Sequence, residues 1–326
     1  MSAPSTADES PWNPSTIAPR VRLIIDNDFA GDPDGLVQLA QHLLSPDCDL
    51  RLVVGSHFRS VGNLDPEACS AGRSVEAARR VAELCGRTDV VIVPGANRGL
   101  DSHDTAIPSP AAEAIVAEAM RDDTDVPLFV ACGAGLTEIA NAWLMEPSIA
   151  ERVTIVWIGG SEHEGLADEV RDEQEYNLSI DRIAAQVVFN RSAMAIWQVP
   201  RDQYRTTLAS RAEMVVRMRP HGPLGLHLFE SLADIFERAA GFGLRFGDTF
   251  ILGDSPLVLL TALQSSFDRA PSSSRYTAMA CPWIDDDGHY VPNPDGRPIR
   301  VYTLLDNRLL LEDLYAKLEL HAAASS

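Results

Sequence analysis

The chain has 326 residues, a hydrophobic fraction of 45% and a formal net charge of −20 at pH 7. This length fits one large α/β domain or two small ones, and the apolar content is sufficient for a sizeable core. Such an acidic chain is not expected to bind nucleic acid or an anionic membrane, because both partners attract basic surfaces. The acidic charge by itself does not identify a substrate.

Residues 1–20 are rich in Ser, Pro and Ala and lack the basic start and apolar segment of a signal peptide. We expect a flexible N-terminal tail there. No apolar stretch approaches the roughly 20 residues that span a bilayer. The five cysteines form no CxxC pair, which indicates neither a disulfide framework nor a structural zinc site and fits a reducing cytoplasm.

The first 200 residues alternate between apolar runs typical of buried strands and segments with helical spacing. The expected strands are 21–26, 50–55, 89–94, 127–132, 152–158 and 194–199, and the expected helices are 36–44, 74–85, 111–120, 137–145 and 181–189. This alternation predicts an α/β fold in which a mainly parallel, Rossmann-like central sheet has helices on both faces.

The pattern changes after Pro200. Helices are expected over 202–218, 226–240, 254–263 and 305–320, and short strands over 276–283, 289–291 and 298–304. Asp285 to Gly288 is typical of a hairpin turn. Since no Pro-, Gly- or Ser-rich linker separates the two halves, residues 21–320 are predicted to form a single domain with C-terminal helices and short strands.

The first expected strand ends in four carboxylates, Asp26, Asp28, Asp32 and Asp34. Carboxylates this close repel one another unless they share a proton or a cation, and hard oxygen ligands suit Ca²⁺ or Mg²⁺. In open α/β sheets, ligands bind beyond the carboxyl ends of the strands. Polar residues near the other strand ends and at the late helix are therefore further candidates, namely Asn63, Cys132, Gly159, Gly160, Glu175, Asn177 and Asp254.

These segments, in this order, resemble the inosine–uridine-preferring nucleoside hydrolase family. Asp26-Asn27-Asp28 is similar to the start of the family's Asp-x-Asp-Pro-Gly-x-Asp-Asp signature, and 130–140 is similar to its Val-Ala-Thr-Gly-Pro-Leu-Thr-Asn-Ile-Ala segment. Gly62-Asn63, Ile158-Gly159-Gly160, Glu175-Tyr176-Asn177 and Gly253-Asp254-Ser255 are similar to its Gly-Asn, Met-Gly-Gly, Glu-Phe-Asn and His-Asp-Pro segments. The resemblance runs from about Val21 to about Leu263 and implies a nucleoside hydrolase-like fold.

The resemblance also implies an activity, hydrolysis of the N-glycosidic bond of ribonucleosides. Ca²⁺, in preference to Mg²⁺, would hold the attacking water and the ribose hydroxyls, and the protein would be a homodimer or homotetramer. Asp28 would contact the metal and accept the proton of the water, and Asp26 would orient Asp28. The other implied metal ligands are Asp34, which could instead bind the 2′-hydroxyl, Asp254, which would also bind the ribose, and the Cys132 backbone carbonyl. Asp32 is an alternative metal ligand. The sugar hydroxyls would be bound by Asn63, Glu175 and Asn177.

Two departures from the family pattern affect the expected chemistry. Gly35 stands where the second Asp of the family pair would chelate Ca²⁺, so Asp34 or Asp32 would have to compensate. Gly253 stands where many members carry a His that protonates the leaving base. His57, His163, His227 and Tyr176 are candidates for that role by residue type. The alternative interpretation is a nucleoside- or sugar-binding protein of the same fold with impaired catalysis.

Other classes are disfavoured by simple absences. Lys317 is the single lysine and has no Gly-rich context, which argues against P-loop and Schiff-base chemistry. A haloacid dehalogenase-type phosphatase also begins with strand-Asp-x-Asp, but it usually needs a downstream lysine. No Glu closes a 12-residue calcium loop that starts at Asp26 or Asp28, which excludes an EF-hand.

Overall fold

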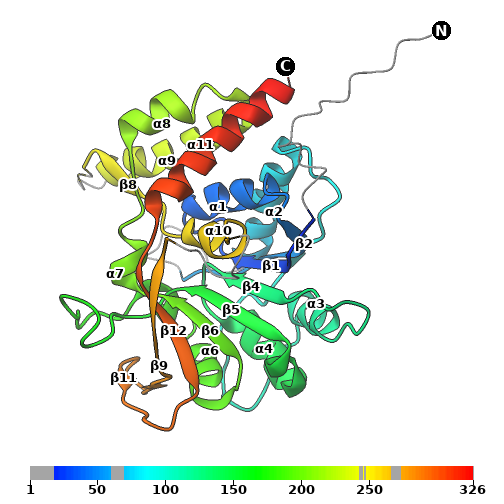
Figure 1. Ribbon diagram of the computed structural model, residues 1–326, viewed down its shortest axis with the longest axis vertical. Helices are drawn as coiled ribbons and strands as arrows, with labels where there is room; N and C mark the ends of the chain where they lie inside the picture. The colour runs from blue at the N-terminus through cyan, green and yellow to red at the C-terminus, as the bar shows by residue number, and fades with distance from the viewer. Residues whose placement is uncertain (1–17, 60–69, 242–244, 246, 266–272, 326) are drawn as a thin grey trace.

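The computed structural model describes residues 18–59, 70–241, 245, 247–265 and 273–325. Its centre is an eight-stranded sheet of order β3-β2-β1-β4-β5-β6-β12-β9, in which only the β12–β9 pair is antiparallel (Figure 1). The strands are β1 (Val21–Asn27), β2 (Cys48–Gly55), β3 (Ile92–Pro94), β4 (Leu128–Cys132), β5 (Val153–Ile158), β6 (Ala195–Val199), β9 (Arg275–Ala280) and β12 (Pro298–Leu304). The predicted mainly parallel sheet is confirmed.

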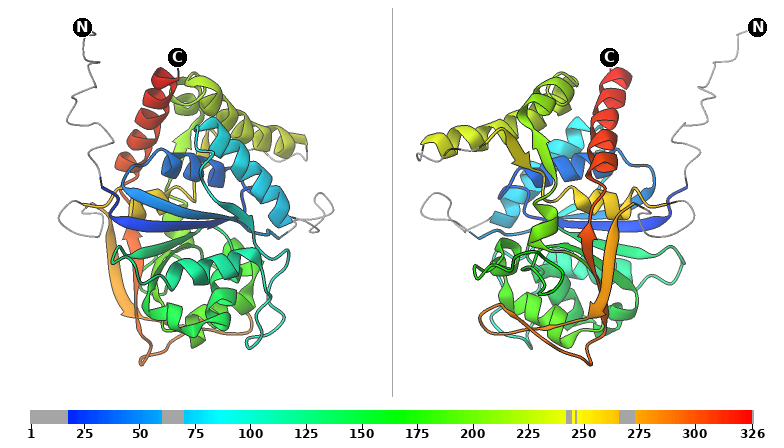
Figure 2. Two further views of the ribbon diagram at one scale, coloured as in Figure 1. Left: turned by 90° about the vertical axis from the view of Figure 1, so that its right-hand side faces the viewer. Right: turned by 60° about the vertical axis from the view of Figure 1, so that its left-hand side comes forward.

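Helices cover both faces of this sheet (Figures 1 and 2). One face carries α1 (Asp34–Leu43), α2 (Ser70–Leu84) and α10 (Pro256–Thr261), with α8 (Arg211–Arg217), α9 (Gly222–Gly241) and α11 (Asn307–Ala324) in a further layer. The opposite face carries α3 (Pro110–Ala119), α4 (Thr137–Met145) and α6 (Arg182–Gln186). The sheet therefore lies between two layers of helices, with the further layer outside α1, α2 and α10.

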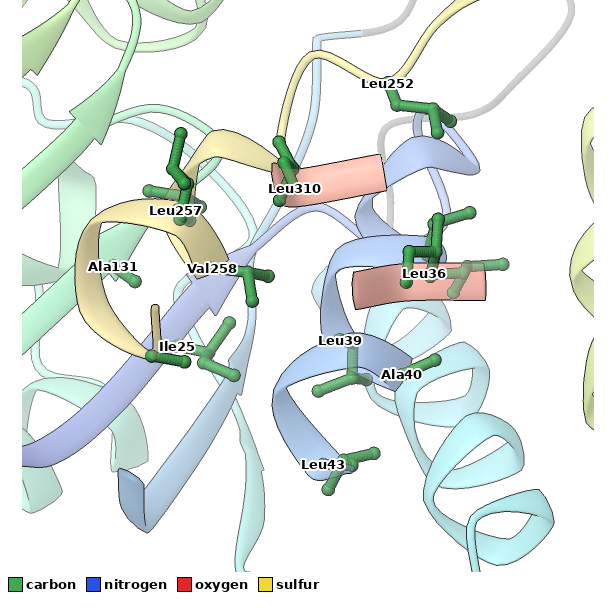
Figure 3. Close-up of a cluster of buried hydrophobic side chains, with 14 of the residues drawn as sticks. Ile25, Leu36, Leu39, Ala40, Leu43, Ala131, Leu252, Leu257, Val258 and Leu310 are labelled. Carbon is green, nitrogen blue, oxygen red and sulfur yellow. The ribbon is translucent and has the colours of Figure 1, made fainter. Parts of the chain in front are cut away.

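Strand β1 is buried on both faces, as expected for the interior of a parallel sheet. Leu23 and Ile25 belong to the apolar core beneath α1 and α10, whereas Ile24 belongs to the core beneath α3 and α4. Figure 3 shows the first of these cores, where side chains of α1, α10 and β1 gather, among them Leu39 and Val258. This packing fixes α1 and α10 against the strand whose end carries the aspartates.

The predicted helix over 202–218 is wrong. The structure has instead α7 (Arg201–Tyr204), β7 (Leu208–Ser210) and α8, and β7 pairs with β8 (Thr249–Ile251). The interruption has a local cause, because the Ser210 side chain caps α8 and forms a capping box with Glu213. The predicted helix over 181–189 is also shorter, since α6 gives way to a wider π-helical turn, η3 (Val187–Arg191).

Short strands form near the C-terminus, but the predicted strand over 276–283 is divided, because β9 ends at Ala280 and a separate strand begins at Trp283. β10 (Trp283–Ile284) and β11 (Tyr290–Val291) pair as a hairpin, and Gly288 at its turn has φ of +85°, a conformation that favours glycine. Residues 1–17 of the predicted tail lie outside the described residues. Within the described part of the chain, no helix combines the length and apolar character needed to cross a bilayer.

Candidate functional site

A cavity of about 170 Å³ lies where β1, β4, β5 and β6 end and α10 approaches. Its walls come from segments far apart in the sequence. The lining residues are Asp28, Asp32, Asp34, Gly133, Ile158, Glu175, Tyr176, Asn177, Tyr204, Gly253 and Asp254. The fold thus brings together six of the sequence-predicted site residues, and no Lys, Arg or His is among the lining residues.

Asp28 follows directly after β1 and is 4% exposed. Its Oδ2 atom has no hydrogen-bond partner among the described residues. Gly31 provides the space beside it, because a Cβ atom there would lie 2.6 Å from Asp28 Oδ2. Burial, then the charges of Asp254 and Asp32, raise the pKa of Asp28 well above its ordinary value. A carboxylate kept this dry and this crowded is expected to attract a cation.

Asp34 and Asp254 meet although they lie far apart in the sequence. The Asp254 backbone N–H donates to Asp34 Oδ2 at 3.1 Å, and Asn27 Nδ2 donates to Asp254 Oδ2 at 2.9 Å. Burial raises the pKa of Asp254 to about 8, an effect that the bond from Asn27 opposes. Burial and the charge of Asp254 likewise raise the pKa of Asp34 well above its ordinary value.

Glu175 and Asn177 are buried residues of the cavity wall and are held by hydrogen bonds to neighbouring segments. Glu175 accepts hydrogen bonds from the Tyr204 hydroxyl at 2.8 Å, from Gly160 N at 2.8 Å and from Leu178 N at 2.9 Å. Asn177 Nδ2 donates to the carbonyls of Gly133 at 3.0 Å and Ile158 at 2.8 Å. Both side chains therefore have fixed orientations before any ligand arrives.

Two predicted residues, Asp26 and Cys132, are not among the residues that line the cavity. Asp26 is fully buried behind the cavity and accepts a hydrogen bond from the Ser56 hydroxyl, and burial raises its pKa to about 8. Cys132 ends β4 and immediately precedes Gly133 in the cavity wall. Asn63 lies outside the described residues.

Of the candidates for protonating a leaving group, some line the cavity and others do not. His163 bonds Gln198 at 2.9 Å and lines a different cavity, His227 lies on α9, and His57 is buried but absent from the lining. Tyr176 lines the cavity, as does Tyr204, which sequence reasoning missed. Tyr204 comes shortly after β6 ends, so applying the strand-end rule to β6 as well would have found it.

The donor set can be tested against a divalent cation. The described residues contain no group of three or more His, Cys, Asp or Glu side chains already arranged to hold a metal. The chemistry nevertheless suits one, because five carboxylates line the cavity and an oxygen of Asp28 has no hydrogen-bond partner among the described residues. The residues fit a hard, oxygen-seeking ion, with some side-chain adjustment needed to close around it.

The structure is an α/β fold with an acidic cavity at the carboxyl edge of a mainly parallel sheet. The sequence profile described as inosine-uridine preferring nucleoside hydrolase matches residues 23–288. The chain belongs to this family, which confirms the resemblance inferred from its motifs. No curated protein sequence is significantly similar to it.

Solved structures agree on the fold. A plant nucleoside hydrolase, PpNRh1, is 16% identical with a TM-score of 0.68, covering 92% of this chain and 99% of its own. A purine-preferring ribonucleoside hydrolase from Gardnerella vaginalis is 18% identical with a TM-score of 0.67, covering 93% and 99%. The type III effector protein XopQ, solved with adenosine diphosphate ribose, is 16% identical with a TM-score of 0.66, covering 93% and 94%.

Proposed function

We propose that the protein hydrolyses the N-glycosidic bond of a ribonucleoside or related N-riboside with the help of Ca²⁺. The observation that carries this proposal is that Asp28, Asp34 and Asp254 line one cavity in a member of the nucleoside hydrolase family. These three carboxylates and the Cys132 carbonyl would hold the ion, with Asp32 as an alternative ligand. Ca²⁺ is preferred to Mg²⁺ because its larger, flexible coordination shell tolerates such a mixed set.

The chain's own residues supply the remaining chemistry. A bound Ca²⁺ would lower the pKa of a water and hold the ribose hydroxyls. Asp28 would accept the proton of that water through its unpartnered oxygen. The surrounding carboxylates favour the positive charge that develops on the sugar in an oxocarbenium-like transition state. Glu175, Asn177, Asp34 and Asp254 would orient the sugar; Asn63 as a further sugar ligand and Asp26 as the residue that orients Asp28 stay predictions.

Departure of the base needs a different donor from the family histidine. A Cβ atom at Gly253 would lie 3.3 Å from the Tyr204 ring and 3.3 Å from Asp34 Oδ2, so Tyr204 borders that space. Burial raises the pKa of Tyr204 and of Tyr176, which keeps both hydroxyls protonated at neutral pH. Each hydroxyl already donates its one hydrogen within the protein, Tyr204 to Glu175 Oε1 at 2.8 Å and Tyr176 to the Arg59 carbonyl at 3.0 Å, so either tyrosine would have to exchange that partner for the leaving group.

The alternative is a nucleoside- or sugar-binding protein with impaired catalysis, favoured by the histidine-free lining of the cavity. Calorimetric titration with Ca²⁺, combined with hydrolysis of p-nitrophenyl riboside, inosine and uridine, separates the two. Ca²⁺ binding with turnover supports the hydrolase, and Ca²⁺ and ribose binding without turnover supports the binding protein. Failure to bind either would contradict both.

We also propose that residues 21–320 form one domain that assembles as a homodimer or homotetramer in the cytoplasm. The continuous eight-stranded sheet supports the first statement, because its strands come from both halves of the sequence. Sedimentation analysis of the purified protein tests the assembly.

A further inference from the structure

Asn27, the last residue of β1, is fully buried beside the acidic cavity and is not itself one of the residues that line it. Its Nδ2 donates to Asp254 Oδ2 at 2.9 Å and to Gln38 Oε1 at 3.2 Å. Its Oδ1 accepts from the Asp28 backbone N–H at 2.8 Å. One amide therefore links the two aspartates that the proposed mechanism uses most, and its bonds fix which atom is oxygen and which is nitrogen.

The Asn27 side chain occupies space that two glycines leave open. A Cβ atom at Gly35 would lie 2.9 Å from Asn27 Nδ2 and 3.3 Å from Asp254 Oδ2. A Cβ atom at Gly133 would collide with the same amide. Gly35 does not have a positive φ, so its backbone does not require glycine. The Asn27 amide, which extends from β1, thus occupies the space that a side chain at position 35 would fill.

A buried polar chain holds this amide from behind. Gln38 Nε2 contacts His42 Nδ1, and His42 Nε2 lies 2.8 Å from Thr261 Oγ1, which donates to the Leu257 carbonyl at 2.7 Å. Every group finds a partner if His42 is neutral, and burial lowers its pKa to about 3. These hydrogen-bonded side chains therefore connect the aspartates through α1 to α10, the helix that begins just after Asp254.

This polar chain is surrounded by apolar packing. Leu36, Leu39 and Ala40 of α1 and Leu257 and Val258 of α10 form the core shown in Figure 3. Hydrogen bonds in such dry surroundings are directional and expensive to leave unmade. The arrangement therefore fixes Asn27 more tightly than a solvent-exposed amide would be fixed.

We propose that Asn27 is a positioning residue that takes the place of a side chain at position 35 and holds the Asp254 carboxylate in the cavity. The proposal rests on the proposed function, because it assigns Asn27 to the same cation and sugar site. Asn27 acts through Asp254 and the backbone of Asp28 rather than on the substrate itself.

The test is a double-mutant cycle of wild type, Asn27→Ala, Gly35→Ala and the double variant. The Ca²⁺ affinity of each is measured by calorimetry and its unfolding temperature by calorimetric scanning without metal. Asn27→Ala removes the bond to Asp254, and Gly35→Ala displaces the amide that makes it. Each single change is expected to weaken Ca²⁺ binding about 10–100-fold, as is usual for residues that orient metal ligands.

The two sites should be strongly coupled. In the Asn27→Ala background the amide is gone and the approach to Asp254 Oδ2 at 3.3 Å remains, so Gly35→Ala should weaken Ca²⁺ binding much less than it does in the wild type. It should also raise the unfolding temperature, since alanine is the better helix former. Equal losses from Gly35→Ala in both backgrounds would overturn the proposal. If the wild type binds no Ca²⁺, the proposed function fails, but the coupling in unfolding temperature still decides the role of Asn27.

Asn141→Ala provides a matched control. Asn141 is also a fully buried amide, and its Oδ1 accepts from the Ile107 N–H at 2.8 Å on the opposite face of the sheet. This change should lower the unfolding temperature while leaving Ca²⁺ affinity unchanged. If Asn141→Ala weakened Ca²⁺ binding as much as Asn27→Ala, the loss would reflect general destabilisation and the proposal would be wrong.

Discussion

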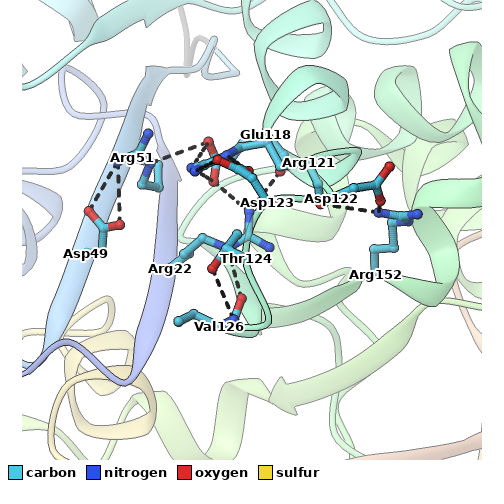
Figure 4. A network of polar contacts seen from close by, with 10 residues as sticks. All are labelled: Arg22, Asp49, Arg51, Glu118, Arg121, Asp122, Asp123, Thr124, Val126 and Arg152. Carbon is cyan, nitrogen blue, oxygen red and sulfur yellow. Dashed lines mark hydrogen bonds and ion pairs between the residues drawn. The ribbon is translucent and has the colours of Figure 1, made fainter.

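The buried charges at the two ends of β1 differ in whether they have partners of opposite charge. At its start, Arg22 is buried, forms an ion pair with Glu118 at 2.6 Å and donates to the Val126 carbonyl at 2.8 Å. Figure 4 shows the network around it, in which Arg51, Arg121 and Arg152 pair with the remaining acids drawn. At the end of the same strand lie Asp28, Asp34 and Asp254 in a cavity lined by no basic side chain.

The difference distinguishes charged residues that stabilise the fold from charged residues that form a binding site. Burying a charge is expensive unless it is paired, so a fold that needed only stability would pair both ends. The amino end follows that rule. The carboxyl end breaks it with several carboxylates at once, and burial raises the pKa values of Asp28, Asp34 and Asp254 there. Unpaired buried carboxylates in a cleft indicate a binding site for a cation.

The largest expected effect comes from Asp28→Asn. Hydrolysis of p-nitrophenyl riboside should fall about 10²–10⁴-fold, because the variant keeps the shape but loses the proton acceptor. Without metal, the same change should raise the free energy of unfolding at pH 8, since it removes a buried charge that faces other carboxylates. An active or less stable variant would argue that Asp28 is not part of an uncompensated cluster.

The second-largest effect is expected in the pH dependence of the free energy of unfolding, to which the carboxylates at the carboxyl end of β1 contribute. The folded pKa of Asp254 is raised to about 8, so the folded state binds more protons than the unfolded state above about pH 4. The metal-free protein should therefore lose stability as pH rises from about 4 to about 8. Saturating Ca²⁺ should reduce this loss, because it binds the deprotonated carboxylates. Urea titrations at several pH values measure both curves, and a loss that is the same with and without Ca²⁺ would contradict the cation site.

Glu118→Gln should change the free energy of unfolding in the opposite direction to Asp28→Asn. The change leaves the buried Arg22 guanidinium without its charged partner and should lower the free energy of unfolding by about 1.5–3 kcal/mol. Activity of the folded protein should be unchanged, because the network lies at the far end of the sheet. Urea unfolding followed by a rate assay checks both parts, and a gain in stability would remove the contrast between the ends.

The smallest effect is expected for Asp122→Asn. Its partner Arg152 lies 2.7 Å away, but the Asp122 side chain is 82% exposed. An exposed pair of this kind contributes little, so the free energy of unfolding should change by less than about 0.5 kcal/mol. The variant serves as the control for both Asp28→Asn and Glu118→Gln, and a loss as large as that from Glu118→Gln would show that exposure does not decide the contribution of these pairs.

The sequence predicts the alternating half of the fold well, because buried parallel strands have an unmistakable apolar pattern. The predicted range for α4 coincides with the observed helix, and the strand predicted over 152–158 differs from β5 by one residue at its start. The pattern after Pro200 is less informative, because β7 and α8 depend on a local cap at Ser210 and on pairing with the distant β8.

The site could be predicted only where strand ends reveal it. Asp28, Asp34 and Asp254 come together as expected, whereas Tyr204 was missed because the end of β6 was not considered. The role of Asn27 could not be predicted, since nothing in one sequence shows that its amide occupies the space beside Gly35. That relation depends on three-dimensional proximity between the end of β1 and the first turn of α1.

The most direct test is a crystal structure of the protein soaked with Ca²⁺ and ribose, with the ion located by anomalous scattering. We expect one ion with oxygen ligands from Asp28, Asp34 and Asp254 at about 2.3–2.6 Å and the ribose hydroxyls bound to it. A cavity that holds ribose without an ion, or an ion bound elsewhere on the protein, would contradict this expectation.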